Sequence, residues 1–419
     1  MSVGNISVQI IGKRDSAEAY AIRDFLHRCG VPFIWKELSN DGEARAQENL
    51  TGLSDGRLPL CIFSDGSRLE HPTVREVSEK LGLFHNPTQS EYDLAIYGAG
   101  PAGLSAAVYG ASEGLKTVVV ERFAVGGQAS TSPRIENYLG FPQGISGAEL
   151  AERALEQATR FGAEILLLRE GVRADFSTGK GVGYLSDGSK IVARASLCAT
   201  GVDYRRLELP EEDRFHGAGL YYGAGASEAS LCGGSENVFI VGGGNSAAQA
   251  AMHFARYAGK VTMVVRDVCL KKSVSQYLVD RISSSPKVEV LLRTQVVALH
   301  GDLTLTAITL RNLDTGKEWC AETNWLFLCL GGLPRTQWAE AVGVVRDEGG
   351  YLMTGPDLMK NGNHPENWPL DRDPYYLETN VPGIFAAGDV RHGSVKRCAS
   401  AVGEGAMAVT FVYRYVMNG

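Results

Sequence analysis

Two glycine-rich stretches have the residue spacing that binds the phosphates of a nucleotide. They are GAGPAG at 98–103 and GGGNSA at 242–247. Small residues there permit a tight turn, a close approach of the backbone to a pyrophosphate, and the packing of a helix against a strand. We therefore expect two dinucleotide sites. Their candidate residues are Gly98, Gly100, Ala102 and Gly103 in the first loop, and Gly242, Gly244, Asn245 and Ser246 in the second.

The residue that ends the strand after each loop indicates which nucleotide the loop prefers. Glu121 can accept hydrogen bonds from both ribose hydroxyls and repels a 2′-phosphate, so the first site is expected to hold the ADP half of FAD. Arg266 ends the corresponding strand after the second loop, and Lys271 and Lys272 follow it; these cations favour the 2′-phosphate of NADPH over NADH. Asp267 weakens that preference, and the alternative is that the cations begin a solvated helix.

Both loops lie between a predicted strand and a predicted helix, a context that a lone glycine motif lacks. The predicted elements are strands at 93–97, 117–121, 237–241 and 261–266, and helices at 104–113 and 246–257. The strands read as continuous apolar runs, as in a parallel sheet that is covered on both faces. This repeated order predicts an α/β fold with two Rossmann-like dinucleotide-binding domains.

Residues 1–83 show a different order of elements, with strands predicted near 6–11, 32–37 and 59–69 and helices near 15–29, 42–52 and 72–82. With Pro59 at the mouth of a strand, this order resembles a glutaredoxin or thioredoxin fold. The resemblance implies a cis Leu58–Pro59 bond, against the alternative of a trans turn proline. It places the two active cysteines on Ser16 and Ala19, so this domain cannot carry out dithiol exchange. A polar linker follows at 84–91.

From Tyr92 to the C-terminus the chain resembles the low-molecular-weight thioredoxin reductases of the FAD/NADPH disulfide-reductase group. Besides the two loops, the likeness rests on GGQASTSPRIENYLGFPQGISG at 126–147, ATG at 199–201 and VPGIFAAGDV at 381–390. It implies a homodimer. It also implies hinges at both connections between an inserted NADPH-binding domain and an FAD-binding domain, which occupy 206–323 and 92–205 plus 324–419, respectively.

The same likeness implies further contacts with FAD. The segment 391–405 is expected to place a helix N-terminus on the flavin. The segment 350–378 is long for this family, and it either covers the acceptor side of the flavin or packs on the N-terminal domain. Asn137 is expected near the isoalloxazine ring. The other residues implied at FAD are Gly127, Gln128, Gly388, Asp389, Arg397, Cys398 and Ala399.

The redox-active CxxC of the family is missing. Its cysteine positions are Gly223 and Ala226, and none of the eight cysteines forms a CxxC pair. A dithiol relay needs one thiolate to attack and a second to resolve, so the sequence predicts that the standard reduction of thioredoxin does not occur. Cys398 and Cys232 are solitary candidates for a redox role, and the alternative is that both are merely packed side chains.

Composition argues against several other classes of protein. The chain has 419 residues and a net charge of −7, which offers no overall basic face for nucleic acid or an anionic membrane. No apolar run approaches the ~18 residues that a membrane span needs. The scattered cysteines have no metal-binding spacing, and we expect them to be reduced thiols in a cytoplasmic protein.

Together these features predict an FAD enzyme that accepts hydride from NADPH and passes electrons directly to a bound acceptor. The expected acceptor is a quinone, another small molecule, a second flavin or a carrier protein. Two alternatives stay open. One is a disulfide reductase that uses Cys398 or Cys232 alone, and the other is a non-catalytic redox sensor that binds FAD and NADPH. In each case the N-terminal domain is a candidate docking surface for a protein partner.

Overall fold

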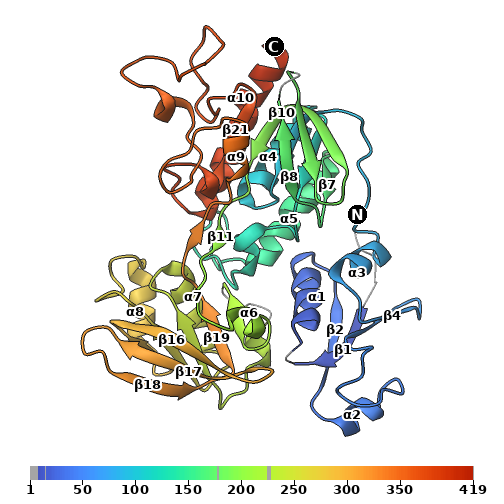
Figure 1. The fold of residues 1–419 in the computed structure, drawn as a ribbon, viewed down its shortest axis with the longest axis vertical. Coiled ribbons are helices and arrows are strands. Elements are labelled where there is room, and N and C mark those ends of the chain that lie inside the picture. Colours follow the sequence, from blue (N-terminus) through green and yellow to red (C-terminus); the bar gives the residue numbers. More distant parts are fainter. Residues whose placement is uncertain (1–7, 15, 177–178, 224–227, 419) are drawn as a thin grey trace.

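The computed structural model describes residues 8–14, 16–176, 179–223 and 228–418. These residues form three units, which Figure 1 shows as three lobes with separate sheets. We call them the N-terminal unit, the first dinucleotide unit and the second dinucleotide unit, in the order in which the chain enters them. The second dinucleotide unit is inserted into the first, because the chain returns to the first unit's sheet with its last strand.

The N-terminal unit has a four-stranded sheet in the order β2-β1-β3-β4, with β1 parallel to β2 and antiparallel to β3. Its elements follow the predicted order, and the Leu58–Pro59 bond before β3 is cis, as predicted. The second helix ends well before residue 52, because Glu48 and Asn49 have positive φ angles that a helix does not contain. The elements are β1 (Val8–Lys13), α1 (Ala17–Arg28), β2 (Phe33–Leu38), α2 (Asp41–Arg45), β3 (Leu60–Phe63), β4 (Arg68–Glu70) and α3 (Val74–Lys80).

The first dinucleotide unit has a seven-stranded sheet in the order β7-β6-β5-β10-β9-β8, and β21 also pairs with β10. The apolar strands β5, β6, β7, β10 and β21 run parallel, as their continuous hydrophobic runs predict. The strands are β5 (Tyr92–Tyr97), β6 (Thr117–Val120), β7 (Glu164–Leu166), β8 (Gly171–Asp175), β9 (Gly181–Leu185), β10 (Lys190–Cys198) and β21 (Ile384–Ala386). The helices are α4 (Pro101–Ser112), η1 (Gly127–Thr131), α5 (Gly147–Arg160), α9 (Trp338–Ala341), η3 (Gly355–Leu358), η4 (Gly388–Val390) and α10 (Cys398–Asn418).

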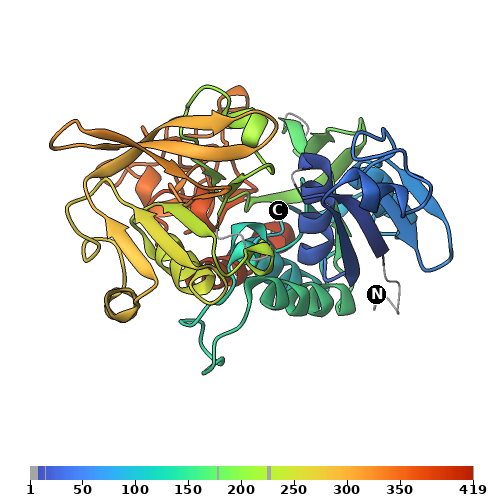
Figure 2. The ribbon, with the colours of Figure 1, turned by 90° about the horizontal axis from the view of Figure 1, so that it is seen from below.

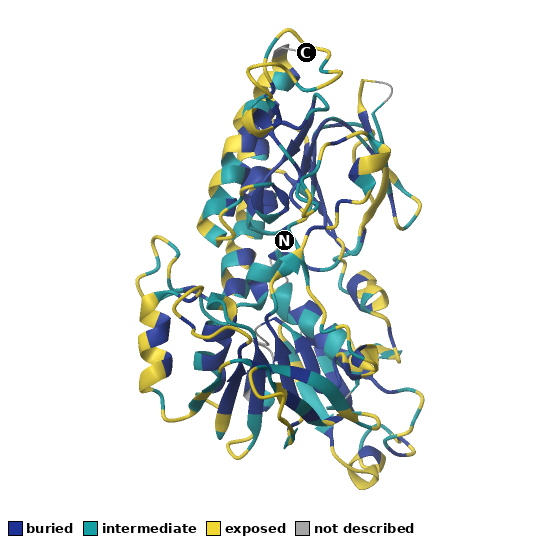
Figure 3. Cartoon of the chain, turned by 60° about the vertical axis from the view of Figure 1, so that its left-hand side comes forward, coloured by how far each residue is buried: buried dark blue, intermediate teal, exposed yellow. Residues whose placement is uncertain are grey.

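The second dinucleotide unit has a parallel five-stranded sheet in the order β12-β19-β13-β14-β15, and a separate sheet, β16-β17-β18, packs on it through a shared apolar core. Figure 3 shows the strands of this lobe largely buried, with exposed residues on its outer helix. The strands are β12 (Leu220–Tyr222), β13 (Asn237–Val241), β14 (Lys260–Val264), β15 (Val288–Leu291), β16 (Thr294–Gly301), β17 (Leu305–Asn312), β18 (Glu318–Glu322) and β19 (Trp325–Leu328). The helices are α6 (Glu212–Phe215), η2 (Ala229–Leu231), α7 (Asn245–Phe254) and α8 (Gln276–Ser284).

A narrow two-stranded ribbon joins the two dinucleotide units. It pairs β11 (Asp203–Tyr204) with β20 (Gly332–Leu333) in antiparallel register. The return to the first unit was predicted at residue 324, but Trp325–Leu328 pairs with β12 and β13 inside the second unit's sheet. The predicted boundary is therefore too early, because this apolar strand is buried between two other strands.

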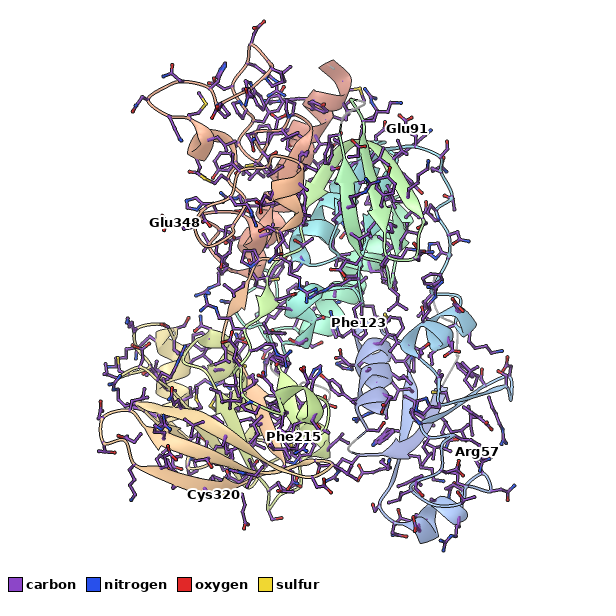
Figure 4. The ribbon with its side chains drawn as sticks, in the orientation of Figure 1. Arg57, Glu91, Phe123, Phe215, Cys320 and Glu348 are labelled. Carbon is purple, nitrogen blue, oxygen red and sulfur yellow. The ribbon has the colours of Figure 1, made fainter. Side chains whose placement is uncertain are left out.

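Helix α1 of the N-terminal unit contacts both dinucleotide units. Figures 1 and 2 show α1 on the side of its unit that faces them. On the first unit, Phe25 packs edge-on against Phe123 with ring centroids 5.6 Å apart, and Figure 4 labels Phe123 at this junction. On the second unit, Arg23 forms a buried ion pair with Glu228, with an N–O distance of 3.4 Å. The N-terminal unit is therefore fixed to both halves of the molecule.

The segment 350–378 packs beside α10, at the opposite end of the first unit from the N-terminal unit (Figure 1). Tyr375 stacks on Phe411 of α10, and Arg372 pairs with Glu378 at 2.7 Å. The expectation that this segment packs on the N-terminal domain is therefore wrong. In the described part of the chain, no helix is long and apolar enough to cross a membrane.

The Arg23–Glu228 pair gives a first testable prediction. Replacing Arg23 by Met leaves the Glu228 carboxylate buried without this cation, and removing one partner of a buried pair costs about 3 kcal/mol or more. We expect the Arg23→Met variant to unfold at a lower denaturant midpoint, measured by circular dichroism. The double variant with Glu228→Gln should recover part of the loss, and an unchanged midpoint in the single variant would contradict this account of the interface.

Candidate functional site

One continuous cavity of about 1520 Å³ reaches both glycine loops and α1. It brings together most of the residues that the sequence singled out. From the FAD prediction, those that line it are Gly98, Gly100, Ala102, Glu121, Gly127, Gln128, Asn137, Gly388, Asp389, Arg397 and Cys398. From the NADPH prediction, they are Gly242, Gly244, Asn245, Ser246 and Arg266. No residue of 350–378 is among the lining residues, so that segment does not cover the acceptor side of this cavity.

The first loop has the close backbone contacts that its glycines predict. A Cβ atom on Gly98 would lie 2.4 Å from the carbonyl oxygen of Ala199, and Gly98 has a φ of +105°. A Cβ on Gly127 would lie 3.1 Å from the Cα of Gly100, so two backbones meet here with no side chain between them. No side chain caps the start of α4 at Gly100. The amides of its first turn can therefore bind a pyrophosphate, which fits FAD.

Gly103 lies behind the loop and does not line the cavity. A Cβ there would lie 1.8 Å from the carbonyl oxygen of Gly98. Its role is the close packing of α4 on the loop, which is one of the three functions expected of this motif.

Glu121 holds the first loop in place as well as facing the cavity. Its carboxylate accepts hydrogen bonds from the backbone N–H groups of Ala99 at 2.8 Å and Phe123 at 2.9 Å, one on each oxygen. Each carboxylate oxygen has a second lone pair, so Glu121 retains the capacity to bind ribose hydroxyls. Glu121 thus also stabilises the first loop, a role that the sequence did not reveal.

The second loop repeats this geometry. A Cβ on Gly242 would lie 2.4 Å from the carbonyl oxygen of Cys329, and no side chain caps the start of α7 at Gly244. The side chain of Asn245 accepts a hydrogen bond from the Ser275 backbone N–H at 2.7 Å, so it ties the start of α7 to the following segment. The uncapped helix start fits the pyrophosphate of NADPH.

Of the three cations predicted at the 2′-phosphate, only Arg266 lines the cavity. Lys271 is exposed and does not line the cavity. The Lys272 ammonium lies 3.5 Å from the Asp267 carboxylate in an exposed ion pair. The contact of the two lysines with a 2′-phosphate therefore stays a prediction, while Asp267 and Ser273, which flank them in the chain, line the cavity.

The C-terminal part of the first site combines a glycine with a half-buried aspartate and an exposed lysine. A Cβ on Gly388 would lie 2.9 Å from the Cβ of Ala102, so the two motifs touch. Burial raises the pKa of Asp389, and the Lys396 ammonium donates a hydrogen bond to its backbone carbonyl. Helix α10 begins at Cys398, and Ala399 is exposed and does not line the cavity, so its FAD contact stays a prediction.

The cysteines near the site are held as neutral thiols. Burial raises the pKa of Cys398 to about 11 and that of Cys329 to about 12, and it also raises the pKa of Cys198. All three line the cavity. Cys232 is buried away from it, and burial raises its pKa as well. Because the thiolate is the nucleophile, these surroundings oppose thiol chemistry.

The Tyr204 side chain occupies the space beside Gly223, one of the two positions where the resembling reductases have a cysteine. Gly223 has a φ of +85°, and a Cβ built on it would lie 2.6 Å from the Tyr204 hydroxyl oxygen. That hydroxyl lies 3.2 Å from the Thr131 hydroxyl, and burial raises the pKa of Tyr204 to about 12. Ala226, the other expected cysteine position, lies outside the described residues.

Sequence reasoning missed the contribution of the N-terminal unit. Arg28 of α1 donates hydrogen bonds to the Ser130 hydroxyl at 2.9 Å and to the backbone carbonyls of Gly127 at 3.1 Å and Ala124 at 3.2 Å. Nothing in the local pattern of α1 distinguishes this arginine from a solvated one, because its partners lie about a hundred residues away in the chain.

Two dinucleotide loops that open into one cavity define a two-nucleotide oxidoreductase. The chain belongs to the pyridine nucleotide-disulphide oxidoreductase family, whose sequence profile matches residues 92–405. FAD and NADPH are the cofactors of this group, in agreement with both loops.

Thioredoxin reductases are among its relatives. That of Bacillus subtilis is 35% identical over 328 residues, which cover 78% of this chain and 95% of that protein. The NADPH-dependent thioredoxin reductase 3 of Arabidopsis thaliana is 33% identical over 84% of this chain, which spans only 65% of that protein. The crystal structure of the Lactococcus lactis enzyme matches with a TM-score of 0.69 at 27% identity, covering 78% of this chain and all of that chain.

The Gly223 contact gives a second prediction. A Gly223→Ala substitution places a methyl group against the Tyr204 hydroxyl at a positive φ, and such strain costs roughly 1–3 kcal/mol. We expect a lower melting temperature. Removing the hydroxyl with Tyr204→Phe should restore part of the loss in the double variant, whereas equal losses in the single and double variants would disprove the contact.

Arg28 gives a third prediction. Arg28→Met removes three hydrogen bonds from the loop at Ala124–Ser130, and hydrogen bonds to charged groups contribute about 1.5–3 kcal/mol each. We expect FAD to bind at least about tenfold more weakly, measured by the recovery of flavin fluorescence on dilution. Arg75→Met is the matched control, since Arg75 forms an exposed pair with Glu79, lies over the Phe84 ring and does not line the cavity. Equal FAD affinity in both variants would exclude a role for Arg28.

Proposed function

We propose that this chain is an NADPH-dependent FAD oxidoreductase that passes electrons directly to a bound acceptor, without a dithiol of its own. The observation that carries the proposal is the contact between Gly223 and Tyr204. A side chain at position 223 would overlap the Tyr204 hydroxyl, which fills the space where the resembling reductases have their first cysteine. The acceptor must then take electrons from the flavin itself.

The thiols near the site support the same proposal. Cys398, Cys329 and Cys198 line the cavity, but burial raises the pKa of each of them. At neutral pH these groups are protonated and therefore poor nucleophiles. A single-cysteine mechanism would need surroundings that lower the pKa of the attacking thiol.

The residues of the chain bind and orient the cofactors. FAD, when bound, exchanges a hydride with NADPH and passes electrons to the acceptor. The amides at the start of α4 and α7 suit the two pyrophosphates, and Glu121 suits the adenosine ribose of FAD. Arg266 at the rim suits a 2′-phosphate, which supports NADPH over NADH.

We infer that the N-terminal unit is a glutaredoxin-like domain that serves as a scaffold. Its sheet order and its element order support this assignment. Ser16, at a position expected for a cysteine, accepts a hydrogen bond from the Ala19 backbone N–H and caps α1. Ala19, at the second position, is fully buried. Both positions therefore contribute to the stability of α1 and not to redox chemistry.

A second candidate function is a disulfide reductase that uses Cys398 or Cys232 with a thiol supplied by its substrate. The names of the relatives favour it, because they are thioredoxin reductases. It differs from the leading proposal in one measurable respect, since its turnover depends on a cysteine of this chain.

The test is an anaerobic titration. NADPH is expected to bleach the visible absorbance of the FAD-loaded protein, and a quinone such as menadione is then expected to restore it, while oxidised thioredoxin does not. The Cys232→Ser/Cys398→Ser double variant should retain quinone turnover within about twofold of the original protein.

Three outcomes would contradict the proposal. No bleaching by NADPH would exclude the reductive step. Bleaching followed by no reoxidation with any acceptor would favour a redox sensor. Reduction of thioredoxin that is lost in the double serine variant would favour the disulfide reductase.

A further inference from the structure

One arm of the cavity lies between α1 and the ribbon that joins the dinucleotide units. Five α1 residues line it at the spacing of a single helix face, namely Ala17, Tyr20, Ala21, Asp24 and Arg28. Tyr204, His216 and Tyr222 line the cavity from the opposite side. We call this region the α1 arm. It needs all three units to form, because each contributes to its wall.

Aromatic rings dominate the α1 arm. Tyr204 and Tyr222 stack with centroids 6.1 Å apart, and His216 packs edge-on against Tyr222 at 5.2 Å and against Tyr20 at 6.2 Å. Burial lowers the pKa of His216, which favours its neutral form. Ring faces of this kind attract flat conjugated molecules. Ala17 and Ala21 present only small side chains to the cavity.

The α1 arm is directly connected to the loop that is expected to hold the flavin. The Tyr204 hydroxyl lies 3.2 Å from the Thr131 hydroxyl, which donates a hydrogen bond to the Gln128 carbonyl at 2.9 Å. Arg28 reaches the neighbouring carbonyl of Gly127 from the other wall. A molecule in the arm would therefore lie next to the FAD loop, on the side where the dithiol of the resembling reductases is missing.

We propose that the α1 arm binds the electron acceptor, and that the acceptor is a small planar conjugated molecule of the quinone class. This inference rests on the proposed function. A quinone accepts two electrons without a disulfide, and its conjugated ring is flat. The overall reaction balances: NADPH gives up a hydride and becomes NADP⁺, and the quinone gains that hydride and one proton from water to become a hydroquinone.

The N-terminal unit also argues for a small acceptor over a protein. Its α1 covers the arm and is held by the buried Arg23–Glu228 pair on one side and by Phe25 against Phe123 on the other. A protein surface would have to displace these contacts before it reached the arm. A small molecule has only to enter the cavity.

The test places a bulky side chain in the α1 arm by substituting a residue of α1. In the FAD-loaded full chain, Ala21→Phe is expected to raise the KM for menadione at least tenfold, while the anaerobic rate at which NADPH bleaches the flavin stays within twofold. Glu18→Phe is the matched control, because Glu18 is exposed on the same helix and does not line the cavity. This control should turn over menadione like the original protein.

A binding measurement makes the test independent of turnover. Menadione added to the oxidised FAD-loaded protein is expected to bind by isothermal titration calorimetry, at least tenfold more weakly to Ala21→Phe. Tyr20→Leu removes an aromatic ring without adding volume, and it should also weaken menadione binding. This variant replaces Ala21→Phe in the test if Ala21→Phe does not fold.

The outcomes separate this inference from the proposed function. Failure of NADPH to bleach the flavin of the original protein would overturn the proposed function, and the inference with it. Normal menadione turnover and binding in both Ala21→Phe and Tyr20→Leu would overturn the inference alone. Reoxidation of the flavin by a purified carrier protein such as rubredoxin, but by no quinone, would also overturn it.

Discussion

The site depends on how closely separate pieces of backbone approach one another around the first glycine loop. The carbonyl of Ala199 leaves no room for a Cβ atom on Gly98, and a Cβ on Gly127 would lie only 3.1 Å from the Cα of Gly100. The parallel strands β5 and β10 bring these segments to the same edge of the sheet. Because the amides of α4 then open into the cavity without a side-chain cap, the backbone itself forms the anion site.

The N-terminal unit belongs to this site and is more than an appended domain. Its buried residues Ile22, Phe25 and Leu26 form one continuous apolar cluster with Leu94 and Ile96 of the first dinucleotide unit. Such a shared core couples the position of α1 to the sheet that carries the first loop. The N-terminal unit therefore contributes a helix face that lines the cavity and an arginine that binds the loop at Gly127.

The loss of the dithiol agrees with the rest of the site. Tyr204 lies on the ribbon between the dinucleotide units, and its hydroxyl takes up the space beside Gly223. The remaining cysteines at the cavity have pKa values raised by burial. These features come from distant parts of the chain, and they support the proposed direct transfer of electrons from the flavin.

The sequence alone determined the features that depend on neighbouring residues: both glycine loops, the parallel apolar strands around them and the absence of a CxxC. Loop chemistry and strand periodicity are local, so they can be read from short stretches. Tertiary structure decided what depends on distant contacts. It placed Arg266 among the residues that line the cavity, placed Trp325–Leu328 inside the second sheet, and brought α1 against Gly127. No local pattern encodes such contacts, because burial and long-range packing, and not propensity, select them.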